Sequence, residues 1–401
     1  MQTNPHLETL PDFPFDRLRT LLDGIDPAAG LDPIALTIGE PQQPVPDWVS
    51  KIVMENAHLW NKYPPFSGSN ALRQAAAGWL GRRYGLTSDH IDPMKHVVAC
   101  AGTREAIYLL PTWAVPLTKG GGRPIVAMPN PFYHVYGTAA LASGAESLYL
   151  SATKETGHLP DLDSLNEDTL ARMAVMFLCS PANPQGVVAD ATYLERAIKL
   201  ARKHDFLLAV DECYAEIYDS KPPVGALQVC RDMGGDASCL FDNVIVFHSL
   251  SKRSNGAGVR SGFMAGDPAI IEAHGRFRSY ISATIPGPID AASVALWNDD
   301  DHVKQIRAFY RRNIDTAEQV LGDRFGFYRP EGGFFLWLDV GDGEQAAQTL
   351  WRDAAVRVLP GAHTSRTGDT GINPGDPYIR IALVEEANTI REACERLIRT
   401  L

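Results

Sequence analysis

A lysine, an aspartate, a tyrosine and an asparagine lie where short apolar runs of the sequence end, and their side chains can carry chemistry together. Lys252 follows such a run in the motif SLSK, and Asp211 ends another in the motif DECY. A lysine at the end of a buried strand is partly desolvated, so its amine is nucleophilic near neutral pH. Tyr214 belongs to the same DECY motif, and Asn183 begins the motif NPQG further upstream. This set can bond a carbonyl carbon through the lysine while the other groups bind the rest of the ligand.

Each of these residues also has an ordinary interpretation. An isolated loop lysine is usually a solvated charge, an aspartate after a strand often caps a helix, and Asn-Pro is a common turn. The combination in this order is much harder to obtain by chance, and it matches the needs of pyridoxal 5′-phosphate (PLP). Lys252 would bond the aldehyde, and Asp211 would keep the ring nitrogen protonated. Tyr214 and Asn183 would donate to the phenolate oxygen. We therefore predict a PLP site, and no metal site.

A phosphate cradle is predicted from two segments. Gly102 and Thr103 lie between a predicted strand and a predicted helix, where the free N–H groups of a helix start bind anions. Ser249 and Ser251 add hydroxyl groups, and Arg260 adds a cation that can bind a phosphate through two nitrogen atoms. Gly-Thr by itself is more often an ordinary helix cap, so this prediction depends on the neighbouring lysine motif.

Three further residues could bind the ring, the phosphate and the substrate. Core packing is the default for an aromatic residue, but Tyr133 follows another strand and could stack on a pyridine ring. Tyr63 lies in a turn-rich loop and could reach a phosphate oxygen. Arg380 lies in an apolar strand, and a buried arginine needs a carboxylate, which an amino-acid substrate supplies if no protein acid does. Other arginines are candidates to bind extra substrate carboxylates, although an ordinary surface charge is the expected interpretation of each: Arg17, Arg104, Arg276 and Arg278.

Helices and short apolar strands alternate from about residue 70 onward. Strands are predicted at 96–100, 124–128, 147–150, 174–179, 206–210, 244–247 and 262–266, with helices at 71–84, 103–115 and 192–203. This pattern predicts an α/β fold with a large, mostly parallel sheet that binds ligands at its carboxyl edge. A long helical stretch is then expected at 291–321, followed by a smaller α+β domain. We expect an N-terminal arm at 1–45 that packs on the small domain or on a neighbour, a large PLP-binding domain at 46–288 and a small domain at 289–401.

The composition excludes several classes of protein. The chain has 401 residues, of which 45% are hydrophobic, so it can bury a full core. No apolar run approaches the roughly 18 residues that span a membrane, and no signal peptide is visible. The formal net charge of −11 without a basic stretch argues against nucleic acid as a partner. The six cysteines show no CxxC spacing and are expected to be reduced, in keeping with the cytoplasm.

These motifs resemble those of the class I/II aminotransferases, which have PLP-dependent fold type I, over nearly the whole chain. The resemblance implies that Lys252 of SLSK bonds the cofactor, and that Asp211, Tyr214 and Asn183 bind its ring. It also implies a homodimer in which Tyr63 reaches the phosphate of the other subunit. The remaining positions that match the family are the phosphate residues Ser249 and Arg260, the ring-stacking Tyr133, the carboxylate-binding Arg380 and Gly39, whose backbone faces the substrate carboxylate.

Within this family, three stretches are similar to the succinyldiaminopimelate aminotransferases of lysine biosynthesis: 13–18, 102–106 and 247–267. This similarity implies glutamate as the amino donor and N-succinyl-2-amino-6-oxopimelate as the acceptor. Two residues depart from the expected pattern. Ala257 stands where a proline is expected, which affects the stiffness of the loop more than the chemistry. Ala101 stands where many relatives have serine or glycine, but a backbone N–H donor does not depend on that side chain. The alternatives are an aspartate, aromatic or alanine aminotransferase, a PLP lyase of the same fold, and a non-enzymatic regulator, which would need a DNA-binding module.

Overall fold

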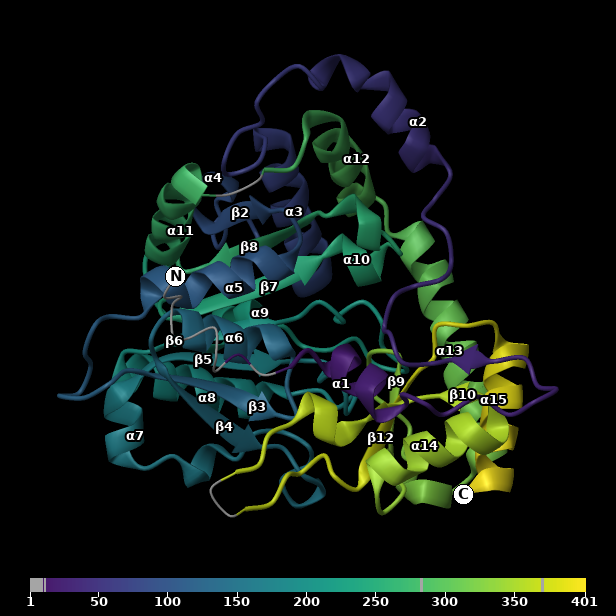
Figure 1. The fold of residues 1–401 in the computed structure, drawn as a ribbon. Helices are drawn as coiled ribbons and strands as arrows, with labels where there is room; N and C mark the ends of the chain where they lie inside the picture. Colours follow the sequence, from purple (N-terminus) through teal and green to yellow (C-terminus); the bar gives the residue numbers. More distant parts are fainter. Residues whose placement is uncertain (1–9, 11, 282–283, 369–370) are drawn as a thin grey trace, which may run out of the picture.

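A seven-stranded sheet forms the centre of the larger part of the molecule (Figure 1). The computed structural model describes residue 10 and residues 12–281, 284–368 and 371–401. The strands lie in the order β2-β8-β7-β6-β5-β3-β4, and all neighbours are parallel except β8, which is antiparallel to both β2 and β7. This confirms the predicted mostly parallel sheet. The strand bounds are β2 Val97–Cys100, β3 Ile125–Asn130, β4 Glu146–Ser151, β5 Met173–Cys179, β6 Leu207–Asp211, β7 Val244–Ser249 and β8 Gly262–Gly266.

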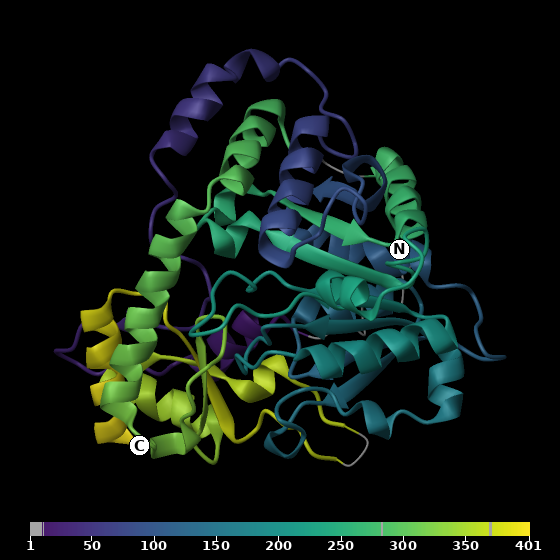
Figure 2. The same ribbon diagram turned by 180° about the vertical axis from the view of Figure 1, so that it is seen from behind.

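Helices cover both faces of this sheet, because successive side chains of its strands point to opposite sides. In β6, Leu208 and Val210 pack in one hydrophobic cluster, whereas Leu207 and Ala209 pack in the other. Figure 1 shows α5 and α6 over the second face, and the view from behind in Figure 2 shows α3 and α12 over the first. The helices of this part are α2 Trp48–Glu55, α3 Asn70–Tyr84, α4 Pro93–His96, α5 Thr103–Ala114, α6 His134–Ala142, α7 Glu167–Arg172, α8 Ala191–His204, α9 Ala226–Met233, α10 Leu250–Arg253, α11 Pro268–Ile281 and α12 Gly287–Asn298.

A smaller unit is built from a three-stranded antiparallel sheet, with strand order β11-β12-β9, and three helices. The N-terminal segment joins it through β1, which pairs in parallel with β10. Figure 1 shows the purple N-terminal segment beside the yellow helices of this unit. The bounds are α1 Pro14–Leu21, β1 Ile34–Ala35, α13 Asp301–Leu321, β9 Phe335–Asp339, α14 Gly343–Ala354, β10 Val356–Arg357, β11 Leu359–Pro360, β12 Tyr378–Ala382 and α15 Ala387–Thr400.

The helical stretch expected at 291–321 is divided into two separate helices, α12 and α13. The buried Arg253 donates to the backbone oxygens of Leu296 (2.7 Å) and Asp299 (3.1 Å) and so satisfies carbonyls at the end of α12. α12 packs in the core of the large unit through Leu296 and Trp297. The expected boundary at residue 288 would separate this helix from its core, and we propose a boundary near residue 300 instead.

The cysteines and helices bear on two further expectations from the sequence. All six cysteines are free, and Cys100 and Cys179 end buried strands as expected. Among the described residues, no helix is both long and apolar enough to cross a membrane.

Candidate active site

A cavity of about 580 Å³ opens at the carboxyl ends of the central strands, between the large sheet and the small unit. Most of the residues singled out from the sequence line it together, although they come from distant parts of the chain. They are Gly39, Thr103, Tyr133, Asn183, Asp211, Tyr214, Ser249, Ser251, Lys252, Arg260 and Arg380. Parallel strands bring their carboxyl ends to one edge of a sheet, which explains why Asn183, Asp211 and Ser249 converge, whereas Arg380 comes from the antiparallel sheet of the small unit.

Lys252 lies in the short helix α10, directly after β7. Ser249 caps this helix by accepting a hydrogen bond from the backbone N–H of Ser251 (3.1 Å). The Lys252 Nζ donates to the backbone oxygen of Gly39 and lies 5.4 Å from the centre of the Phe334 ring. Burial lowers the pKa of Lys252 to about 8. The amine is therefore neutral in a much larger fraction of molecules than that of a surface lysine.

Asp211 is the last residue of β6, and its carboxylate is buried. It accepts hydrogen bonds from the Tyr136 hydroxyl (2.8 Å) and from the backbone N–H of Cys213 (3.2 Å). Burial raises the pKa of Asp211, and a cation placed beside it would favour the ionised form again. The sequence did not assign Tyr136 a role. Its position about one helical turn after Tyr133 could have indicated that the two side chains lie on the same side of the helix, near the same site.

The start of α5 and the loop that contains Arg260 form one surface. Gly102, the N-cap of α5, has a φ of +81°, and a side chain there would collide with the guanidinium of Arg260. The positive φ favours glycine at this position, and any side chain there would also displace the guanidinium of Arg260. Arg260 donates to the backbone oxygens of Ala257 (2.9 Å) and Ala101 (3.4 Å), and no described acidic side chain forms an ion pair with it. This surface can bind a phosphate through the N–H groups of a helix start and a guanidinium.

Arg380 lies in β12 with 6% of its surface exposed. It donates to the backbone oxygen of Thr37 (2.8 Å) and to Oδ1 of Asn183 (3.2 Å), and its guanidinium lies 4.4 Å from the centre of the Phe335 ring. Its Nε is buried without a partner, and no carboxylate pairs with it in the described part of the chain. Burial lowers the pKa of Arg380 to about 10. The sequence-based expectation of a buried arginine that lacks a protein acid therefore agrees with the geometry.

Comparisons with known proteins identify the family of this chain. The profile of the family "Aminotransferase class I and II" matches residues 32–397. This chain is a class I/II aminotransferase. It is 30% identical over 404 residues to LL-diaminopimelate aminotransferase of Syntrophobacter fumaroxidans (98% of this chain, 97% of the relative). It is 34% identical to 4-dedimethylamino-4-oxo-anhydrotetracycline transaminase OxyQ of Streptomyces rimosus (98% and 100%). An aminotransferase structure from Neisseria meningitidis covers 99% of each chain at 35% identity with a TM-score of 0.93.

This family depends on PLP, and the residues of this aminotransferase fit the cofactor. The partly neutral amine of Lys252 suits a bond to an aldehyde, and Asp211 can bind a protonated ring nitrogen. The surface formed by Gly102 and Arg260 suits a phosphate. Tyr133 offers an aromatic ring at the same cavity, which fits a planar ligand.

Lys252 of the apoprotein should bond PLP faster as the pH rises through about 8, because only its neutral amine attacks the aldehyde. Below this pH the rate should fall by roughly tenfold per unit, and above it the rate should level off. Stopped-flow absorbance after mixing apoprotein with PLP at a series of pH values measures this rate. A rate that still climbs steeply at about pH 10, the range of an ordinary lysine, would contradict the assigned pKa.

The other candidate residues of this aminotransferase lie in different surroundings. Tyr63 is fully exposed and lies outside the cavity lining of its own chain, so its predicted role in a second subunit stays a prediction. Arg278 is buried and pairs with Glu105 at 3.1 Å, so the expected surface charge is wrong there. Arg17 binds the backbone oxygen of Ala362, and Arg276 lines a separate hollow. Of the four extra arginines, only Arg104 lines the cavity.

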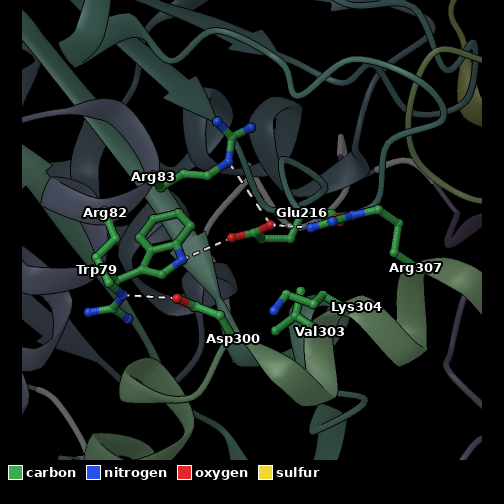
Figure 3. A pocket seen from close by; sticks show the side chains of 8 residues that line it. All are labelled: Trp79, Arg82, Arg83, Glu216, Asp300, Val303, Lys304 and Arg307. Carbon is green, nitrogen blue, oxygen red and sulfur yellow. Dashed lines mark hydrogen bonds and ion pairs between the residues drawn. The ribbon is translucent and has the colours of Figure 1, made fainter.

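A second hollow, of about 150 Å³, lies between α3 and α13 and is lined by a network of ion pairs (Figure 3). Glu216 lies at its centre and is nearly buried. It accepts hydrogen bonds from Trp79 Nε1 (2.9 Å) and Arg307 (2.7 Å), and Arg83 lies 4.0 Å away. Figure 3 also shows Arg82 paired with an aspartate at the edge of the hollow. These charges are largely satisfied by one another, so the network joins α3 and α13 rather than forming a second site of chemistry.

Replacing Glu216 by alanine should lower the free energy of unfolding by about 3–5 kcal/mol, because buried arginines would lose their counter-ion. Denaturant unfolding followed by circular dichroism measures the change. Glu195→Ala removes an exposed carboxylate that pairs with Lys199, and it should cost less than about 0.5 kcal/mol. Equal effects of the two substitutions would contradict the importance of this network.

Proposed function

We propose that this aminotransferase moves the amino group of glutamate to N-succinyl-2-amino-6-oxopimelate, in the diaminopimelate route to lysine. The proposal is supported by the similarity of the segments around Lys252, Gly102 and Phe13 to succinyldiaminopimelate aminotransferases. Arg380 carries the argument that the substrate is an amino acid, because a buried cation without a protein acid needs a carboxylate ligand.

Unsuccinylated diaminopimelate is the second candidate substrate. Several relatives at 30–32% identity are LL-diaminopimelate aminotransferases, and they cover nearly all of this chain. Both candidates share a long skeleton with a carboxylate at each end. The cavity of about 580 Å³ has room for such a skeleton.

The roles that we propose for the residues follow from their geometry. PLP, when bound, supplies a ring that withdraws electrons from the α-carbon of the substrate. Lys252 Nζ would accept the proton of that carbon, which suits a group with a pKa of about 8. Asp211 would hold the proton of the ring nitrogen. Tyr214 and Asn183 would donate to the ring oxygen, and Arg380 would fix the α-carboxylate.

The phosphate would be bound by Gly102, Thr103, Ser249, Ser251 and Arg260, with Tyr133 against the ring. The backbone N–H of Gly39 would donate to the substrate carboxylate, while its backbone oxygen accepts from Lys252. We also propose a homodimer in which Tyr63 reaches the phosphate site of the partner subunit. The full exposure of the Tyr63 side chain supports this, and a molar mass of two chains by light scattering is the expected result.

A panel of keto acids with glutamate as donor tests the proposed acceptor. The succinylated aminoketopimelate should have a higher kcat/KM than its unsuccinylated analogue and oxaloacetate. If the unsuccinylated compound is preferred, the second candidate replaces the first. If oxaloacetate or an aromatic keto acid is preferred by about tenfold, equivalent to about 1.4 kcal/mol, both fail and the aminotransferase assignment stands.

Arg380→Lys should raise KM for donor and acceptor alike, because both place their α-carboxylate at the same cation in turn. Lysine keeps the charge but loses the planar fork of donors, and the loss of one charge-assisted hydrogen bond corresponds to roughly 10- to 100-fold. Steady-state kinetics with each substrate varied separately measures the two KM values. An increase for only one substrate would show that Arg380 binds a side chain rather than the shared carboxylate.

A further inference from the structure

Four lysine and arginine side chains line the active-site cavity, and three of them have roles in the proposed function. Lys252 is assigned to the cofactor aldehyde, Arg260 to the phosphate and Arg380 to the α-carboxylate. Arg104 is the fourth. A cation that lines a cavity without a counter-ion creates a preference for an anionic ligand group at that place.

Arg104 is the second residue of α5 and is held from one side only. Its Nε donates to the hydroxyl of Tyr133 (2.7 Å), and its guanidinium carbon lies 5.9 Å from the centre of that ring. In the described ranges no carboxylate lies within ion-pair distance of it, and the hydrogen bonds found for it do not use its two Nη atoms. These two atoms form the fork that binds a carboxylate through two parallel hydrogen bonds.

The neighbouring His134 lies among several positive charges of this part of the cavity. His134 follows Tyr133, and it also lines the cavity. Burial first, and then the positive charges of Arg104, Arg380 and Arg366, lower its pKa to about 4. His134 is therefore neutral at pH 7, can accept no more than a hydrogen bond, and is not a counter-ion for Arg104.

We propose that Arg104, oriented by Tyr133, binds a second carboxylate at the far end of the substrate and so selects dicarboxylic over monocarboxylic amino acids. This inference rests on the proposed function, and it applies equally to the succinylated and unsuccinylated candidates. Tyr133 has two tasks in this arrangement, since its ring lies at the cofactor site while its hydroxyl fixes the guanidinium of Arg104.

Two amino acids of equal chain length provide the test. 2-Aminopimelate carries a terminal carboxylate that 2-aminoheptanoate lacks, and the ratio of their kcat/KM values measures selection for that group. In the holoenzyme Arg104→Gln should lower this ratio by about 10- to 100-fold, the value of a charge-assisted hydrogen-bonded pair, chiefly through KM. Arg104→Lys should restore part of it.

Three controls separate this role from others. Arg17→Gln removes an arginine outside the cavity lining and should leave the ratio within about threefold of the wild type. Tyr133→Phe should lower the ratio less than Arg104→Gln; an equal loss would show that Arg104 acts only through the tyrosine. The Kd for PLP should change little in Arg104→Gln. A weakened Kd with an unchanged ratio would place Arg104 at the phosphate and overturn the proposal.

Binding of unreactive acids keeps the test independent of turnover. Pimelate and heptanoate differ by the same terminal carboxylate, and their Kd values can be measured from the cofactor absorbance. If the wild type transaminates neither amino acid, the binding measurement decides alone, and the proposed function is judged separately by the panel of keto acids. Loss of the preference for pimelate over heptanoate in Arg104→Gln would support the role of Arg104, and an unchanged preference would overturn it.

Discussion

Lys252→Ala is expected to abolish both turnover and the bond to PLP that borohydride reduction traps. The amine lies at the end of β7, and burial lowers its pKa to about 8, so it is the lysine best suited to react with an aldehyde. The same amine would serve as the base for the α-proton, so its loss removes two functions at once. Peptide mapping of the reduced wild-type protein should place the adduct on Lys252.

The fold of Lys252→Ala should be intact, because a cavity-lining lysine that donates to one backbone oxygen adds little packing. Lys199→Ala, which removes an exposed lysine of α8, is the matched control and should retain full activity. An adduct mapped to any other lysine of the wild type would overturn the assignment of Lys252.

Asp211→Asn is expected to lower kcat by about a thousandfold, the range seen when an enzyme loses a preorganised electrostatic group. Asparagine has the same shape, so its oxygen can still accept from the backbone N–H of Cys213, while its amide N–H can donate to the hydroxyl of Tyr136. It carries no charge, however, and cannot favour a protonated ring nitrogen. The effect should appear in kcat more than in KM, because the charge acts on the transition state.

The occupancy of PLP should be measured alongside, so that loss of cofactor is distinguished from loss of rate. Near-normal kcat in a fully loaded Asp211→Asn protein would mean that Asp211 serves only as a structural cap at the end of β6.

Many residues that line the cavity could be predicted from the sequence, because they lie in or directly after apolar runs that are recognisable as buried strands. The apolar run before Asp211 is a strand buried on both faces, and its polar end must lie at the edge of the sheet. The same reasoning applies to Lys252 after β7. The position of Arg380 among apolar residues indicated burial, and the need for a carboxylate followed from its charge.

Features that depend on distant contacts could not be predicted in this way. The break between α12 and α13 is stabilised by Arg253, which lies more than forty residues upstream. Arg278 can be buried because it pairs with Glu105 and donates hydrogen bonds to two backbone carbonyls, and none of these groups is near it in sequence. The antiparallel direction of β8 leaves no trace in its hydrophobic pattern, since strands of either direction can be buried on both faces.

The most direct test of the central claim is a single half-reaction without an acceptor. Purified holoenzyme is mixed with excess ¹⁵N-glutamate, and 2-oxoglutarate, ammonia and carbon dioxide are quantified. An aminotransferase should release about one equivalent of 2-oxoglutarate per chain, keep the ¹⁵N label on the protein–cofactor complex, and pass it to a keto acid added afterwards. Release of ammonia or carbon dioxide, or no 2-oxoglutarate while PLP is bound at Lys252, would contradict the account.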